Sequence, residues 1–134
     1  LIWSVTSYSE LHKDAEDINR WNSLNPSKKN KKSYLDKNIL IENGPVIAIS
    51  DYVKLVAEQI APYINCPFLS LGTDGFGRSE TRQYLRDFFE VSAHYIVLST
   101  LNLLVKENIL SKNVLDKAIK MYNIDTSKPN PKSI

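Results

Sequence analysis

Histidine and cysteine, the side chains most often used as acid–base catalysts and as nucleophiles near neutral pH, are few in this sequence and lie far apart. His12 and His94 are the only histidines, and Cys66 is the only cysteine. The two histidines have no metal-ligand spacing to each other, and a single cysteine excludes an intramolecular disulfide and a multi-cysteine metal site. Cys66, between Asn65 and Pro67, is interpreted as an unreactive thiol. The sequence also lacks the Gly-x-Ser-x-Gly nucleophile elbow, so we predict no catalytic constellation in this chain.

A glycine-rich stretch is the strongest candidate for ligand binding. Gly72–Glu80 reads GTDGFGRSE and holds three of the chain's four glycines, directly after the apolar run Phe68–Leu71. It lacks the Gly-Lys-Ser/Thr end of a Walker loop, and it differs from the Gly-x-Gly-x-x-Gly of a dinucleotide site. Neither kind of nucleotide-phosphate loop is therefore predicted here.

Two interpretations of this glycine turn stay open at the level of sequence. In the first, Gly75 and Gly77 adopt positive φ at little cost and reverse the chain, while Phe76 packs into the core. In the second, Arg78 lies beside a helix N-terminus that Ser79 caps, and there it holds an anion or a partner. The sequence favours the structural turn over the anion site.

A lysine run, KKNKK at Lys28–Lys32, is the most strongly charged segment. No aromatic residue is interleaved with it, and 15 acidic residues bring the net charge of the chain to only +2. We therefore interpret Trp21–Asn38 as a solvated, flexible loop, and we expect no nucleic-acid partner. We also find no apolar run of the roughly 18 residues that a membrane span needs, and we expect no membrane partner.

Alternation of apolar segments predicts an α/β domain in three layers, and the length of 134 residues suits one such domain. Continuous apolar runs are expected for strands whose two faces are covered by helices. The segment Ile96–Val105 is apolar nearly all round, which predicts a helix deep in the core. We predict strands at Leu1–Ser7, Val46–Ile49 and Phe68–Leu71. We predict helices at Ser9–Arg20, from a Ser50 or Asp51 cap to Pro62, at Glu80–Phe89, at Ala93–Glu107 behind a Ser92 cap, and after a Ser111 cap.

Three blocks of this sequence together resemble one enzyme family. They are WSVTSYSELHKDAEDINRWNSLNP at Trp3–Pro26, ISDYVKLVAEQIAPYI at Ile49–Ile64, and LGTDGFGRSETRQYLRDFFEVSAHYIV at Leu71–Val97. The tail NIDTSKPNPKSI is similar as well, and the resemblance is weakest across Lys28–Gly44. The family is that of the homodimeric bacterial pyruvate dehydrogenases, the thiamine-diphosphate-dependent decarboxylating component of their complex. More distantly, GTDGFGRS resembles a turn in the last domain of transketolases.

The resemblance implies a fold and a position in a larger protein. Residues 1–134 would form a three-layer, transketolase C-terminal-like domain with a mainly parallel sheet that lacks its first strand and helix. Since the chain opens on Leu1 within a strand-like run, we expect a carboxyl-terminal fragment of a longer chain. Exposed apolar surface and an uncovered sheet edge would make the fragment marginally stable by itself.

The resemblance also implies an activity for the whole protein, namely decarboxylation of pyruvate and transfer of the acetyl group to lipoyl groups on the way to acetyl-CoA. Thiamine diphosphate and Mg²⁺ would bind outside this segment, so no catalytic, cofactor-binding or metal residue is carried over, and the fragment alone would be inactive. The implied partners are a second copy of the enzyme, the lipoyl acetyltransferase and the dihydrolipoyl dehydrogenase. The implied location is the cytoplasm.

Two alternatives stay open beside this interpretation. One is a free-standing module that binds an anion or a partner through the glycine turn and Arg78. The other is the carboxyl-terminal domain of another transketolase-like enzyme, such as a transketolase.

Overall fold

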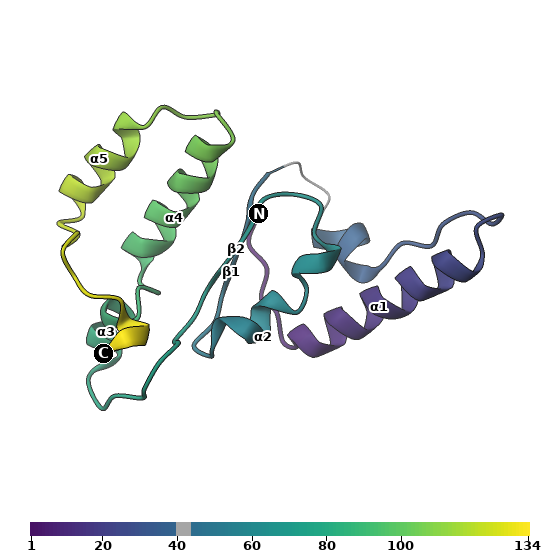
Figure 1. The fold of residues 1–134 in the computed structure, drawn as a ribbon, viewed down its shortest axis with the longest axis horizontal. Coiled ribbons are helices and arrows are strands. Elements are labelled where there is room, and N and C mark those ends of the chain that lie inside the picture. The colour runs from purple at the N-terminus through teal and green to yellow at the C-terminus, as the bar shows by residue number, and fades with distance from the viewer. Residues whose placement is uncertain (40–43) are drawn as a thin grey trace.

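A two-stranded parallel sheet lies at the centre of the computed structural model, which describes residues 1–39 and 44–134. Strand β1 (Val46–Ile49) pairs with strand β2 (Phe68–Leu71), in a register that runs from Val46 opposite Phe68 to Ile49 opposite Leu71. Both strands have the predicted bounds. Helix α1 lies on one side of the sheet, and the α4–α5 pair lies on the other (Figure 1). The chain is thus a helix-rich α/β domain.

The helices lie in the predicted order, but several of them begin or end at other residues than predicted. Helix α2 is shorter than predicted, because Pro62 has no N–H to donate and lies in a separate 3₁₀ turn. The tail ends in another 3₁₀ turn. The helical elements are α1 (Tyr8–Leu24), a π-helical turn (Leu35–Ile39), α2 (Lys54–Glu58), a 3₁₀ turn (Ala61–Tyr63), α3 (Arg82–Phe88), α4 (Ala93–Lys106), α5 (Asn113–Met121) and a 3₁₀ turn (Pro131–Ser133).

Leu35 anchors the larger of two hydrophobic clusters and is fully buried. It packs with Ala15 of α1 and with Ile60 and Ile64, which follow α2. The sequence interpretation placed Leu35 in a solvated loop, and that was wrong. A local cap starts the π-helical turn, since the Asp36 carboxylate accepts hydrogen bonds from the backbone N–H and the hydroxyl of Ser33, at 2.9 and 2.7 Å. A second cluster joins Leu71, Phe89 and Val91.

The first residues do not form the predicted strand. Leu1 and Ile2 are 83% and 98% exposed, and the backbone of this segment is not paired with another strand in the described structure. Ser7 instead starts α1, and its hydroxyl accepts a hydrogen bond from the Glu10 N–H at 3.3 Å. Alternation and β-propensity predict a strand only where a neighbour can pair with it.

Helix α4 begins at the predicted residue and ends one residue early, and it is less deeply buried than predicted. Leu103 is its buried residue, and Val97 is 37% exposed. Ser92 lies at the N-cap position as predicted, although its hydroxyl makes no capping hydrogen bond there. Lys112, not Ser111, is the N-cap residue of α5.

The helical stretch Arg82–Lys106 is long and apolar enough to cross a membrane by length and composition alone. It is not one continuous helix, because α3 ends at Phe88 and Glu90 has a φ of +60° before α4 begins. The 14 residues of α4 rise about 21 Å, which is shorter than a bilayer's hydrocarbon thickness of about 30 Å. Helix α4 alone is therefore too short for a transmembrane span.

Cys66 packs against the Leu35 cluster, and burial raises the pKa of its thiol. Because the thiolate is the reactive form, we predict that iodoacetamide at pH 8 labels Cys66 about threefold more slowly in the folded chain than in urea. The label is specific, since the chain has one cysteine. Mass spectrometry of timed samples measures the rate, and equal rates in the two states would contradict the burial of this thiol.

Candidate functional site

The glycine turn leaves the carboxyl end of β2 and leads to α3 (Figure 1). In parallel α/β sheets, ligands bind beyond the carboxyl ends of the strands. The turn and the segment that follows β1 meet at this end of the sheet, because the two strands are parallel and in register. This end of the sheet is the candidate site.

Hydrogen bonds tie the start of the glycine turn to the segment after β1. The Thr73 N–H donates to the Tyr52 carbonyl at 2.9 Å, and the Thr73 hydroxyl donates to the Asp51 carbonyl at 2.9 Å. The Asp74 carboxylate accepts from the backbone N–H of Lys54, the first residue of α2, at 2.9 Å. Asp74 therefore caps α2 from a distant part of the chain.

The predicted caps of α2 do not form. Val53 is at the N-cap position of α2 and has no side-chain capping bond. Ser50 bonds locally instead, accepting from the Tyr52 N–H at 3.0 Å, and the carbonyl of Asp51 serves Thr73. The sequence next to α2 suggested Ser50 and Asp51 as caps of this helix. Asp74, which is distant in the sequence, caps it instead through a tertiary contact.

The glycines of the turn differ in what they require. Gly75 has a φ of +109°, and a Cβ there would lie 3.0 Å from the Pro131 carbonyl. Gly72 approaches the backbone more closely still, since a Cβ would lie 2.5 Å from the Tyr52 carbonyl. Gly77 has no atom within 4 Å of such a Cβ, and its φ lies outside the left-handed region. The expectation that Gly77 adopts a positive φ was wrong, and Gly72 was the residue that the sequence interpretation missed.

The side chains around Gly77 also differ from expectation. Phe76 is 85% exposed and does not pack into the core. Thr81, not Ser79, caps α3, where its hydroxyl accepts from the Tyr84 N–H at 3.3 Å. The Arg78 guanidinium lies 4.3 Å from the centre of the Phe88 ring. Arg78 thus makes a cation–π contact with the body of α3.

A cavity of about 930 Å³ lies between the glycine turn, α2 and the tail. Three lysines and three carboxylates line it, so their formal charges cancel. A site that selects anions would need an excess of positive charge. The charged lining residues are Lys54, Lys128, Lys132, Glu58, Asp74 and Glu90.

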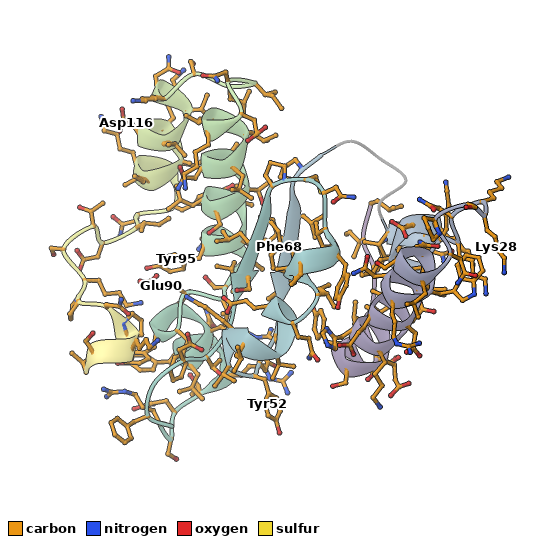
Figure 2. All side chains as sticks on the ribbon, turned by 45° about the vertical axis from the view of Figure 1, so that its right-hand side comes forward. Lys28, Tyr52, Phe68, Glu90, Tyr95 and Asp116 are labelled. Carbon is orange, nitrogen blue, oxygen red and sulfur yellow. The ribbon has the colours of Figure 1, made fainter. Side chains whose placement is uncertain are left out.

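Lys128 joins the tail to the carboxyl end of α3. Its ammonium donates to the carbonyls of Asp87 and Phe88 at 2.6 and 2.8 Å, and it lies 3.8 Å from the Glu90 carboxylate. A cation at this end of a helix interacts favourably with the last carbonyls and with the negative end of the helix dipole. Glu90 and Tyr95 lie near each other where α4 begins (Figure 2). Burial raises the pKa of Tyr95, and the negative charges of Glu90, Asp87 and Asp125 raise it further. No local pattern in the sequence predicted the contact between Lys128 and the end of α3.

We predict that Lys128→Met loosens the tail and destabilises the domain by about 1.5 kcal/mol, because two hydrogen bonds from a charged donor are lost. Hydrogen exchange should become faster at the tail amides of Ser127 and Ser133. Lys132→Met is the matched control, since no hydrogen bond or ion pair of the described structure uses the Lys132 side-chain ammonium. Equal exchange in the two variants would contradict the proposed role of Lys128.

The two histidines are held in separate places. The His12 Nδ1 is 2.8 Å from the Gln59 carbonyl, and the His94 ring stacks on Tyr122 with a centroid separation of 4.7 Å. Within residues 1–39 and 44–134, no group of three or more histidine, cysteine, aspartate or glutamate side chains is arranged to hold a metal ion.

Comparison with known protein families gives a match over more than half of the chain. The family model described as the transketolase-like TK C-terminal domain matches residues 1–92. The matched region contains β1, β2 and the glycine turn.

Curated relatives match nearly the whole chain. The pyruvate dehydrogenase E1 component of Buchnera aphidicola subsp. Acyrthosiphon pisum is 52% identical over 132 residues, which cover 98% of this chain. The proteins of the same name from Cupriavidus necator and Escherichia coli K12 are each 42% identical, over 99% and 98% of this chain. The chain spans about 15% of the length of each of these relatives.

Proposed function

This chain belongs to the transketolase-like C-terminal domain family, and on that premise we propose that it serves as the carboxyl-terminal domain of a pyruvate dehydrogenase E1 component. The observation that carries the proposal is the identity of 42–52% across nearly the whole chain to three proteins of that name. The relatives are about seven times longer, so the activity belongs to the longer protein in this proposal.

In that protein, pyruvate is decarboxylated and its acetyl group is transferred to lipoyl groups. Thiamine diphosphate, when bound with Mg²⁺, supplies the carbanion chemistry that protein side chains lack. In this proposal, other parts of the enzyme hold the cofactor and the metal, because the curated relatives are about seven times longer than this chain. The chain by itself would not turn over pyruvate.

The proposed role of this domain is to complete the subunit and to support a homodimer. The enzyme would work in the cytoplasm beside a lipoyl acetyltransferase and a dihydrolipoyl dehydrogenase. We propose that Gly75, Gly77, Arg78 and Ser79 belong to a structural turn. The contact between Arg78 and Phe88 and the cancelled charges of the cavity support this over an anion site.

The test begins with the gene that encodes this chain. We expect it to encode, upstream of Leu1, the Gly-Asp-Gly…Asn segment that binds the diphosphate in this family. The purified full-length protein should acetylate a lipoyl domain in the presence of pyruvate, thiamine diphosphate and Mg²⁺, and the 134-residue chain should not. A gene without the upstream segment would overturn the assignment, and pyruvate turnover by the chain alone would overturn the structural role.

A further inference from the structure

The lysine run at the carboxyl end of α1, here named the basic loop (Lys28–Lys32), is a charged surface that the proposed function does not use. All four of its lysines are exposed. Lys28 lies on the opposite side of the molecule from Asp116 of α5 (Figure 2). A partner could therefore reach the basic loop without approaching the candidate site.

Hydrogen bonds and cation–π contacts join the basic loop, which lies in the segment predicted to be a flexible loop, to α1. The Asn22 side chain makes two hydrogen bonds with the backbone of Lys31. It donates to the Lys31 carbonyl at 3.0 Å and accepts from the Lys31 N–H at 2.8 Å. The Lys28 N–H donates to the Asn25 carbonyl at 3.0 Å. The Lys31 and Lys28 ammonium groups lie 4.1 and 5.7 Å from the centre of the Trp21 ring. An aromatic residue therefore organises the lysines from α1, although none is interleaved with them.

The positive charge of the basic loop has no counterion in the described structure. The ion pairs of residues 1–39 and 44–134 involve His12, Lys13, Arg86 and Lys128, and none of them involves a basic-loop lysine. The carboxyl end of α1 offsets only part of the charge, at the last turn of that helix. Like charges held close together repel each other, and a partner of opposite charge would relieve that repulsion.

We propose that the basic loop is a docking surface for an acidic polypeptide segment of a partner protein. Carboxylates complement lysine ammonium groups, and a loop that is already ordered loses little conformational entropy on binding. Nucleic acid fits less well, because the basic loop contains no arginine and two ammonium groups occupy the Trp21 ring on which a base would stack. The proposal does not depend on the enzyme activity proposed above.

The first experiment removes the charge from the full-length protein. In the basic-loop variant, Lys28, Lys29, Lys31 and Lys32 are all changed to Gln. The matched control changes four lysines around α4 and α5, namely Lys106, Lys112, Lys117 and Lys120. Fluorescence anisotropy with a labelled poly-L-glutamate peptide should show about tenfold weaker binding by the basic-loop variant and less than about twofold weaker binding by the control. Equal losses in the two variants would overturn the proposal, because binding would then follow net charge alone.

The second experiment keeps every charge and releases the basic loop. Asn22→Ala removes both hydrogen bonds to the Lys31 backbone, and we expect about threefold weaker binding of the same peptide with unchanged circular dichroism. Wild-type affinity in this variant would overturn the claim that the surface is preorganised.

A duplex DNA probe that bound more tightly than the peptide, with the same loss in the basic-loop variant, would assign the surface to nucleic acid instead. Pyruvate turnover should be unchanged in all these variants.

Discussion

Replacing Gly72 with valine should remove the folded state of this chain. A Cβ at this position would lie 2.5 Å from the Tyr52 carbonyl oxygen and 2.8 Å from the Lys54 nitrogen. Both are backbone atoms, so the side chain cannot be accommodated by rotation of a neighbour. The segment after β1 would have to move away, which would break the hydrogen bonds from Thr73 to Tyr52 and from Lys54 to Asp74. We expect a destabilisation of about 4 kcal/mol or more.

Thermolysin digestion and circular dichroism measure this effect. The Gly72→Val chain should be degraded at the rate of the urea-unfolded wild type. Gly77→Val is the matched control from the same turn, because no atom lies within 4 Å of a Cβ at Gly77 and that chain should resist digestion like the wild type. If Gly77→Val were the more damaging of the two changes, the geometry of the turn described here would be wrong.

Leu35→Ala should destabilise the domain by about 3 kcal/mol, the second largest effect expected. Leu35 is 0% exposed and packs against residues of α1 and of the segment that follows α2, so its removal leaves a cavity where these elements meet. Urea unfolding followed by tryptophan fluorescence measures the change. Leu24→Ala is the control, since Leu24 is 63% exposed and should change stability by less than about 0.5 kcal/mol. Equal effects of the two substitutions would show that the π-helical turn does not close this cluster.

The parts of the fold that follow local rules could be predicted from the sequence. Strands β1 and β2 were predicted residue for residue, because each is a short apolar run next to proline or glycine. Helix α4 was predicted to within one residue, because a long apolar segment without proline has few alternatives to a helix. The strand predicted at Leu1–Ser7 failed because pairing depends on a neighbouring strand and not on the segment alone.

The contacts that shape the candidate site join residues far apart in the chain and were missed. Asp74 caps α2 across 20 positions, and Lys128 reaches the α3 carbonyls across about 40. No local pattern distinguishes these two side chains from the other aspartates and lysines. Leu35 could have been found, because Ser33 and Asp36 have the three-residue spacing of a helix cap. Ser79 was predicted as the cap of α3, and Thr81, two residues later, has that role instead.

The long reach of Lys128 has a consequence for the order of events during biosynthesis. Its side chain is added 41 residues after Asp87, which takes about 2–8 s at the usual rates of translation. During that interval no lysine ammonium binds the carbonyls at the end of α3. The tail residues that line the cavity beside the glycine turn have not yet been synthesised. The nascent chain can assemble the sheet first, and it closes this corner of the molecule only after the tail has left the ribosome.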